Sequence, residues 1–435
     1  MKADDERTLP PSLQEIASCV NGYDPKSLPV AQAQEFIARL VPRVRSIEMV
    51  ALRSALGRVL ARDIVSAIDV PAHDNSAMDG YALRGSDLAA DGDTVLTVVG
   101  SGFAGQADTA VAARGECVRI MTGAVMPAEL DTVVPQEFTT VAGDRVTIPA
   151  GAVRTGDNRR LAGEDLARGA AALKAGRLLR PADLGMLASL GQAEVPVFRR
   201  LRVAFFSTGD ELRSIGEPLP AGCVYDSNRY TLWGMLARLG VEIIDLGVVR
   251  DDPQALEDTF RAAARDADAV ITSGGVSVGE ADHTKMVMAK LGDVLFWRIA
   301  MRPGRPMAIG RIDSGNHGAI LFGLPGNPVA VMVTFYALVR DALLAMSGAA
   351  PQPLPLLRAA SAEPIRKKPG RTEYQRGIVT RAADGGEWQV RITGSQGSGI
   401  LRSMSAANGL VVLHHAQGDV AAGEMVDVLP FDGLI

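Results

Sequence analysis

The chain has 435 residues, of which 47% are hydrophobic and 22% charged, a composition typical of a globular protein with a sizeable core. Its 45 basic and 50 acidic side chains leave a formal net charge of −5, and only 5% of its residues are aromatic. This balance argues against a surface that coats a polyanion or stacks single-stranded nucleic acid, so we expect no nucleic-acid partner.

Three features of the sequence bear on its compartment. Cys19, Cys117 and Cys223 lie far apart and match no zinc or redox spacing, which predicts reduced thiols. The charged N-terminus lacks the apolar core of a signal peptide. The longest apolar stretch, residues 329–339, is too short to span a bilayer and predicts a core helix. We therefore expect a cytoplasmic protein with no membrane partner.

The N-terminal region predicts a tail followed by helices. Residues 1–27 are polar and carry three prolines, which indicates a flexible N-terminal extension. The apolar spacing over residues 30–44 predicts a helix, and residues 49–60 predict a second one. These helices belong to a discontinuous domain I of helical or mixed character, formed by residues 28–71 and 163–200.

Residues 72–162 change character. Short β-type runs alternate there with glycines and Asp-containing turns, which predicts a β-rich lobe, domain II. The chain then returns to a helical pattern over residues 163–191. Pro181 is placed to begin a helix and Gly191 to end it.

Domain III, residues 201–350, alternates apolar strands with helices. Gly240 is placed to end one of these helices, and Asp252 with Pro253 to begin the next. Strands that alternate with helices indicate βαβ units and a mostly parallel sheet. Such strands are covered on both faces, which explains their continuous apolar runs. The sequence therefore predicts a central parallel α/β domain.

Ligands of open parallel sheets bind at the carboxyl ends of the strands. Four consecutive strand ends in this domain are small and polar and three of them carry glycine, so their backbone N–H groups can face a bound anion. We expect this edge to bind a phosphate-bearing substrate. The residues concerned are Ser207, Thr208, Gly209, Asp210, Ser273, Gly274, Gly275, Ser277, Pro325, Gly326, Asn327 and Pro328.

Three acidic residues, Glu211, Asp251 and Asp282, lie on the same loops. Mg²⁺ prefers carboxylate and phosphate oxygens, so these acids beside a phosphate site suggest a metal site. The alternative is that they cap helices. Asp251 fits both interpretations about equally.

The segment Trp297 to Pro306 holds three arginines, Arg298, Arg302 and Arg305, around two prolines. Arginine recognises tetrahedral oxyanions through paired hydrogen bonds, which favours a substrate role over a solvated charged loop. The chain has no GxxxxGK[ST] run and no GxSxG run, which argues against a P-loop nucleotidase and an α/β-hydrolase.

Two further regions complete the chain. Turn formation alone would explain Asp74, Asn75 and Gly80 in the polar loop 71–82. Domain IV, residues 351–435, opens with a proline-rich linker and continues in β-type runs without a helix, which predicts a small β-barrel or sandwich.

Taken together, these motifs resemble the molybdopterin molybdenumtransferase (MoeA) family, which is similar to the E domain of gephyrin. Seven motifs in the same order carry the resemblance, and the match runs from about residue 31 to the C-terminus. The motifs are DNSAMDGYA (74–82), RIMTGA (119–124), STGDEL (207–212), RDDP (250–253), TSGGVSVGEADHTK (272–285), PGRP (303–306) and GLPGNPVA (323–330).

The resemblance implies a multidomain α/β protein whose central domain is like molybdopterin adenylyltransferase (MogA-like). It implies that adenylylated molybdopterin and molybdate react, with Mg²⁺ assisting, to give molybdenum cofactor and AMP. It also implies a homodimer with a shared active site and catalytic roles for five residues, Asp79, Thr122, Glu211, Asp251 and Asp282. Asp79 and Thr122 would come from the partner subunit. Contacts with a molybdopterin adenylyltransferase and with molybdoenzyme chaperones are further expectations.

The chain departs from the family pattern at two positions. Arg298 and Arg302 stand where lysine is common, which keeps the charge but not lysine's compact ammonium group. Near the C-terminus, Ser403 belongs to a polar loop that resembles the family's loop facing the cleft. Two alternative functions stay open, a molybdopterin adenylyltransferase and a non-catalytic molybdopterin-binding carrier or scaffold.

Overall fold

The computed structural model describes residues 12–106, 110–276, 283–313, 318–382 and 385–431. The chain folds into two compact units. The first unit is formed by Met1–Glu48, Gly57–Ala61 and Val197–Ile435, and the second by Met49–Leu56 and Arg62–Pro196.

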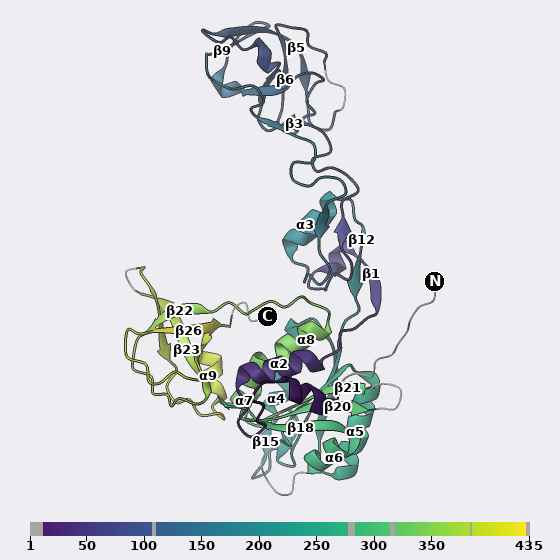
Figure 1. Cartoon of the computed structure of the whole chain (residues 1–435), viewed down its shortest axis with the longest axis vertical. Coiled ribbons are helices and arrows are strands. Elements are labelled where there is room, and N and C mark those ends of the chain that lie inside the picture. The colour runs from purple at the N-terminus through teal and green to yellow at the C-terminus, as the bar shows by residue number, and fades with distance from the viewer. Residues whose placement is uncertain (1–11, 107–109, 277–282, 314–317, 383–384, 432–435) are drawn as a thin grey trace. The chain divides into compact units, whose positions relative to one another are not determined.

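A six-stranded sheet forms the centre of the first unit (Figure 1). Its first four strands run parallel, whereas β20 and β18 are antiparallel to their neighbours. The predicted central α/β domain is therefore confirmed, with two added antiparallel strands that the sequence pattern did not indicate. In spatial order the strands are β16 (Glu242–Val249), β13 (Arg202–Thr208), β17 (Ala269–Ser273), β21 (Gly318–Leu324), β20 (Pro306–Asp313) and β18 (Gly292–Arg298).

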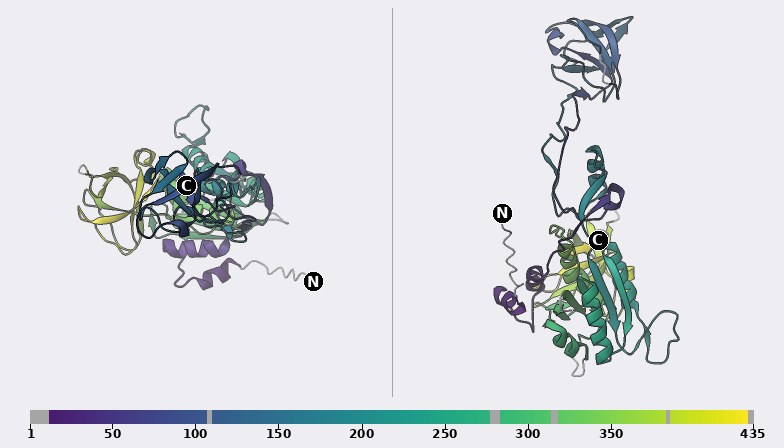
Figure 2. Two further views of the ribbon diagram at one scale, coloured as in Figure 1. Left: turned by 90° about the horizontal axis from the view of Figure 1, so that it is seen from above. Right: turned by 90° about the vertical axis from the view of Figure 1, so that its right-hand side faces the viewer.

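Helices cover both faces of this sheet, as the side view in Figure 2 shows. Phe206 of β13 packs against Phe260 of α5 in one of the resulting cores, where both side chains are fully buried. The helices are α4 (Ser227–Arg238), α5 (Pro253–Asp266), α6 (His283–Leu291) and a continuous run made of α7 (Pro328–Thr334), the π-helical turn η4 (Phe335–Val339) and α8 (Arg340–Met346).

The helix ends follow the predicted signals. The Asp252 side chain accepts a hydrogen bond from the Ala255 amide with Pro253 at the first helical position, and Gly240 ends α4 with a φ of +68°. The run Pro328–Met346 is long and apolar enough to cross a membrane, but 67% of its most apolar 18-residue stretch is buried inside the protein. It is therefore packed as a core helix.

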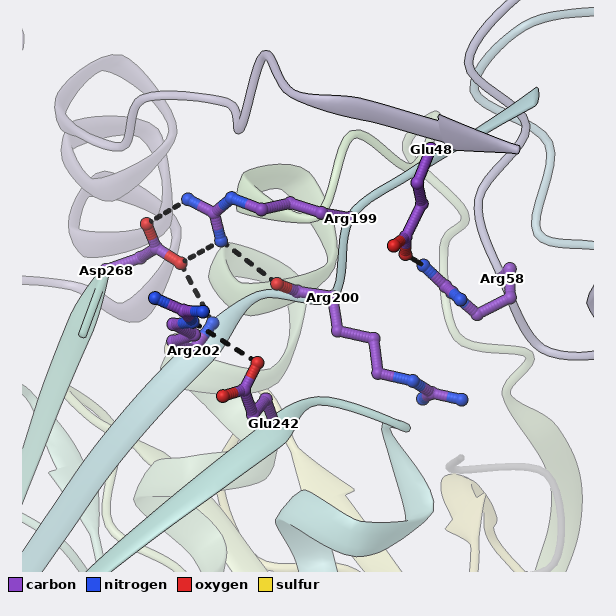
Figure 3. A network of polar contacts seen from close by, with 7 residues as sticks. All are labelled: Glu48, Arg58, Arg199, Arg200, Arg202, Glu242 and Asp268. Carbon is purple, nitrogen blue, oxygen red and sulfur yellow. Dashed lines mark hydrogen bonds and ion pairs between the residues drawn. The ribbon is translucent and has the colours of Figure 1, made fainter. Parts of the chain in front are cut away.

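An arginine-rich network fixes the start of the sheet (Figure 3). Arg199 makes two hydrogen bonds to Asp268, at 2.8 and 2.7 Å, and the Arg202 amide donates to the same carboxylate at 2.8 Å. Arg58 bonds the Glu48 carboxylate and, at 2.8 Å, the Phe198 carbonyl. These contacts tie residues 198–202, the entry to β13, to the rest of the first unit.

The N-terminal segment packs against the same unit. Helix α1 (Leu13–Cys19) buries Leu13 and Ile16, and α2 (Val30–Leu40) confirms the first predicted helix. The prediction of a loosely held extension is therefore wrong for residues 12–27, because an apolar stripe on α1 has a partner surface on α2 and β18. Residues 1–11 lie outside the described part of the chain.

The C-terminal strands of the first unit close into a barrel, as predicted, because β23 pairs with β25 as well as with β24. The short strand β19 (Met301–Arg302) adds to it beside β23. Contrary to the prediction of no helix, the six residues of α9 (Leu401–Ala406) are helical. In spatial order the barrel strands are β23 (Thr372–Arg381), β24 (Trp388–Ile392), β22 (Leu357–Ser361), β26 (Met425–Pro430) and β25 (Gly409–Leu413).

The second unit carries the predicted β-rich lobe, a six-stranded sheet with buried Leu83, Val118 and Val133. Its order is β7 (Thr132–Pro135), β4 (Gly80–Leu83), β6 (Glu116–Ile120), β5 (Thr94–Gly102), β9 (Arg145–Ile148) and β8 (Thr140–Ala142). Short turns η2 (Gly85–Asp87) and η3 (Gln136–Phe138) connect its strands.

Two helix predictions in or beside this unit are wrong. Residues 49–60 form β1 (Ile47–Ala51) and the 3-10 turn η1 (Leu52–Ala55), and Gly57, with a φ of +70°, prevents a helix from continuing. Only the end of the stretch 163–191 is helical, as α3 (Pro181–Ser189). The remaining short strands are β2 (Ile64–Val65), β3 (Asn75–Ser76), β10 (Arg159–Arg160), β11 (Ala171–Leu173) and β12 (Glu194–Phe198), with β14 (Leu212–Arg213) and β15 (Val224–Tyr225) in the first unit.

The multidomain α/β fold expected from the sequence is confirmed by these elements. The boundaries of the four predicted domains stay a prediction. The structure separates two compact units, and these do not test where the four domains begin and end.

Candidate functional site

A pocket of about 1170 Å³ opens at the carboxyl ends of the parallel strands of the first unit. Three walls form it. The loops after β13, β17 and β21 provide the first, and residues 301–306, hereafter the arginine turn, provide the second. The third comes from the barrel, through Arg371 and residues 396–398. The pocket lies where a parallel sheet is expected to bind its ligand.

Two consecutive glycines shape the loop after β17. Gly274 and Gly275 have φ values of +98° and +66°, in the region that residues with a Cβ rarely adopt. A Cβ on Gly274 would lie 2.6 Å from the Thr208 carbonyl oxygen, and one on Gly275 would lie 2.5 Å from Thr284. Glycine is therefore required at both positions, and the backbone of this loop faces the pocket at close range.

Several buried polar atoms around the pocket lack a partner among the described residues. They are Thr208 Oγ1, Asn228 Oδ1, Asp251 Oδ1 and Thr284 Oγ1, all from residues that line the pocket. Burying a polar atom without a hydrogen bond costs about 1–3 kcal/mol, so such a cluster is uncommon in a purely structural region. Their position indicates hydrogen bonds to a ligand.

Asn228 connects two of the loops. Its Nδ2 donates to the Gly326 carbonyl at 2.7 Å and to Ser273 Oγ at 3.2 Å. A carbonyl oxygen can only accept, so the amide nitrogen must face Gly326 and Oδ1 is turned to the other side. Sequence reasoning missed Asn228, because the run from Asp226 begins α4 and capping already explains polar residues there.

Two of the three predicted metal-site acids, Glu211 and Asp251, line the pocket. Asp210, which does not line it, accepts a hydrogen bond from the Asp251 amide at 3.3 Å and so supports that loop. Asp282 and Ser277 lie outside the described residues. Within the described ranges, no three His, Cys, Asp or Glu side chains gather as a metal site.

Two of the three predicted arginines, Arg302 and Arg305, line the pocket. Gly304 between them has a φ of +97°, and a Cβ there would lie 2.2 Å from Thr334 Oγ1, so the turn is fitted closely over α7. Arg298 ends β18 and is not among the lining residues that the structure describes. The structure therefore brings Arg302 and Arg305 to the site and not Arg298.

The barrel wall depends on a buried arginine that the sequence analysis did not single out. The Arg376 side chain is 0% exposed and donates to the carbonyls of Gln396 at 3.3 Å and Gly397 at 2.9 Å, and to Ser403 Oγ at 2.9 Å. Burial, together with the charge of Arg302, lowers the pKa of Arg376 to about 10. Ser403 is thus placed beneath the pocket wall and supports it, rather than lining the pocket as predicted.

Some of the other predicted substrate-binding residues line the pocket and some do not. Ser207 is buried, with its hydroxyl 3.2 Å from that of Ser273, and Pro328 begins α7, so neither is among the described lining residues. The predicted residues that line the pocket are Thr208, Gly209, Ser273, Gly274, Gly275, Pro325, Gly326 and Asn327.

Asp79 and Thr122 lie in the second unit, next to each other. Asp79 Oδ1 accepts two hydrogen bonds, from the Thr122 amide and from the Thr122 hydroxyl, both at 2.7 Å. Both bonds lower the pKa of the exposed Asp79 carboxyl, and the bond from the Thr122 amide contributes more than the bond from the hydroxyl. The pair therefore presents an ionised carboxylate at ordinary pH.

Three family models match the chain. They describe the MoeA N-terminal region (domain I and II) over residues 28–191, a "probable molybdopterin binding domain" over residues 204–345, and the MoeA C-terminal region (domain IV) over residues 358–431. The pocket lies mostly in the second of these regions and is completed by the third.

Known proteins match along nearly the whole length. The molybdopterin molybdenumtransferase of Haemophilus influenzae is 41% identical over 94% of this chain and all of its own length. That of a Nostoc species is 37% identical over 92% of this chain and 93% of its own. The crystal structure of the molybdopterin biosynthesis moeA protein from Pyrococcus horikoshii matches with a TM-score of 0.80 at 29% identity, covering 93% of this chain and all of that one. The chain belongs to the molybdopterin molybdenumtransferase family.

Proposed function

We propose that the chain inserts molybdenum into molybdopterin, using adenylylated molybdopterin and molybdate and releasing AMP. The activity named for its relatives supports the transfer of molybdenum to molybdopterin. The observation that carries the detailed proposal is a single pocket in which a glycine-lined strand-end loop faces an arginine turn. The first suits a phosphate group and the second a tetrahedral oxyanion.

The adenylate phosphate would lie against the strand-end loops. There the backbone of Gly274 and Gly275 can approach it closely, and Thr208, Asn228 and Thr284 have unpaired polar atoms that can bond the ligand. AMP is released when the oxygen of a water molecule bonds to the adenylate phosphorus and the P–O bond to the molybdopterin phosphate breaks, so that this phosphate leaves with the electron pair and the water gives its proton to solvent. Side chains that hold the two phosphates in line lower the barrier for this step by positioning.

Molybdate would bind at the arginine turn. It is a tetrahedral dianion, and Arg302 and Arg305 can offer it paired N–H donors. Arg371, which also lines the pocket, is held at 2.7 Å by the buried carboxylate of Glu373 and so is directed by the barrel. The substitution of arginine for the family's common lysine at Arg302 keeps a cation at this wall.

Two acids among the described residues are placed to take part in binding a Mg²⁺ ion. Glu211 and Asp251 line the pocket, and Asp251 has a buried carboxylate oxygen without a partner in the described ranges, which is the kind of oxygen that Mg²⁺ binds. Asp282, the third predicted acid, would complete the set. When bound, the ion would neutralise charge on the leaving phosphate.

The proposal includes a homodimer in the cytoplasm. Asp79 and Thr122 of one subunit would complete the pocket of the other, with the ionised Asp79 carboxylate contributing to catalysis. Asp79 is held by two hydrogen bonds in the second unit, whereas the pocket lies in the first unit. A site shared between subunits would explain why this carboxylate is so firmly positioned.

The experiment is a single-turnover assay with purified protein, adenylylated molybdopterin, molybdate and Mg²⁺. We expect AMP release and a product that activates a cofactor-free molybdoenzyme. Binding of the adenylate with no AMP at any molybdate concentration would instead support the carrier, and synthesis of the adenylate from ATP would support the adenylyltransferase. Asp251→Asn should slow AMP release, whereas Asp258→Asn, on the exposed face of α5, should not.

A further inference from the structure

Residues 12–27 precede the region that the family model matches, which begins at residue 28, and yet they pack as part of the first unit. Ser12 and Glu15 form a capping box that begins α1, and Leu13, Ile16 and Val20 are buried. Helix α1 packs against α2 and β18, and the two helices lie side by side at the N-terminal end of the coloured chain in Figure 2.

The loop after α1 holds the last part of β18 through an aromatic cluster. Trp297 is 2% exposed, and its indole N–H donates to the Tyr23 hydroxyl oxygen at 2.8 Å. Phe36 of α2 packs edge-on against Trp297, with ring centroids 5.0 Å apart, and lies 5.9 Å from the Tyr23 ring. Indole has one N–H donor, so the Tyr23 oxygen satisfies its full hydrogen-bonding capacity.

The same loop also binds the backbone that follows Trp297. The Arg298 amide donates to the Pro25 carbonyl at 2.8 Å, and the Leu28 amide donates back to the Arg298 carbonyl at 3.0 Å. The Ala300 amide donates to the Leu28 carbonyl at 2.7 Å. Residues 297–300 are thus held by the N-terminal segment on both their side-chain and their backbone groups.

These residues lead directly into the pocket wall. The Ile299 amide donates to the Arg305 carbonyl at 2.7 Å, which closes the arginine turn, and Met301 to Pro306 line the pocket. A shift of Trp297 or Arg298 would therefore be passed to Arg302 and Arg305 within a few bonds. Guanidinium groups that bind an oxyanion in pairs lose much of their advantage when misplaced by about 1 Å.

We propose that residues 12–28 are a positioning element for the proposed oxyanion site, and that the Tyr23–Trp297 hydrogen bond is the contact that sets the arginine turn. The proposal rests on the proposed function for the identity of the oxyanion. Its structural part, control of the arginine turn by an N-terminal segment, does not depend on it.

Three measurements on the full-length protein test the proposal. Calorimetric titration with molybdate and, separately, with AMP measures the two halves of the pocket. Hydrogen–deuterium exchange of the peptide that covers residues 297–306 measures the turn itself. The variant is Tyr23→Phe, which removes only the acceptor of the indole N–H. Tyr225→Phe is the matched control, because it removes a hydroxyl bonded to the Glu217 carbonyl at 3.0 Å, and neither residue belongs to the N-terminal segment or to the turn.

We expect Tyr23→Phe to exchange faster over residues 297–306 and to bind molybdate about three- to tenfold more weakly, as loss of one buried hydrogen bond would give, with AMP affinity unchanged. Tyr225→Phe should match the wild type in all three measurements.

Unchanged exchange and unchanged molybdate affinity in Tyr23→Phe would overturn the proposal, and so would an equal loss of AMP affinity, which would indicate general destabilisation. A wild type that binds no molybdate would refute the proposed function, while the exchange experiment would still decide whether Tyr23 controls the turn.

Discussion

Asn228 places a donor and a free acceptor between two strand-end loops. Replacement by aspartate keeps its shape but turns the donor that faces the Gly326 carbonyl into an acceptor, so two oxygens would oppose each other where the distance is now 2.7 Å. We expect Asn228→Asp to lower the free energy of unfolding by about 1–3 kcal/mol and to weaken AMP binding. Urea unfolding and calorimetry measure both effects. The exposed Asn21→Asp is the control, and equal values for the two variants would contradict the bridging role.

Thr122 lowers the pKa of Asp79 through two hydrogen bonds, of which the one from its amide has the larger effect and the one from its hydroxyl the smaller. Thr122→Val removes only the hydroxyl, so the pKa of Asp79 should rise but stay below its ordinary value, whereas Thr122→Ser should leave it unchanged. Carbon-13 NMR titration of the carboxyl group measures it. Because the folded pKa is the lower one, the stability that these bonds contribute is present above the ordinary value of 3.8 and lost as the pH falls through the folded pKa. A pKa of Asp79 that does not move in Thr122→Val would show that the Thr122 hydroxyl does not contribute to the shift.

At the scale of elements, Arg376 joins strand β23 to the loop that forms the barrel wall. Its planar group reaches several carbonyl oxygens at once, and a lysine ammonium could not reach them all. We expect Arg376→Lys to destabilise the fold by about 2 kcal/mol and to weaken molybdate binding, as measured by urea unfolding and calorimetry. Arg381→Lys, at the exposed end of the same strand, should change the stability by no more than about 0.5 kcal/mol. Equal destabilisation by the two variants would argue against a special role for the buried arginine.

The elements that could be predicted from the sequence are those with a strong local signal. Parallel strands such as β13 and β17 are apolar along their whole length because both faces are covered, and Pro253 and Gly240 mark helix ends by backbone geometry alone. The stretch 49–60 has helical apolar spacing, but that spacing cannot reveal that residues 47–51 pair as a strand or that Gly57 adopts a positive φ.

The residues of the candidate site also differ in whether a local sequence signal predicts them. Glycine-bearing strand ends could be placed at one edge of the sheet because parallel topology gathers them there. Arg376 and Asn228 could not be found, since each acts through contacts between residues about 20 to 100 positions apart, which no local pattern records. The sequence predicts Arg298 for the site because it lies near Arg302 and Arg305 in the chain. In the structure Arg298 ends strand β18, and its backbone is bound by Pro25 and Leu28.

At the scale of the whole molecule, the proposed shared site can be tested by mixing two inactive variants. Asp79→Asn disables what a subunit would give to its partner, and Glu211→Gln disables what it keeps for its own pocket. In a twofold-symmetric dimer made from equal amounts, half of the dimers carry one of each, and one of their two sites has both native residues. We expect each variant alone to be inactive and the refolded mixture to regain roughly a quarter of the wild-type rate of AMP release.

The control for this experiment is a mixture of Asp251→Asn with Glu211→Gln. Asp251 and Glu211 line the same pocket, and each subunit supplies both residues to its own pocket. Each heterodimer would therefore have one site lacking Asp251 and one lacking Glu211, and no activity should return. Light scattering would verify that the mixed species are dimers. If the first mixture stays inactive although heterodimers form, Asp79 serves the pocket of its own chain or none, and the shared site must be abandoned.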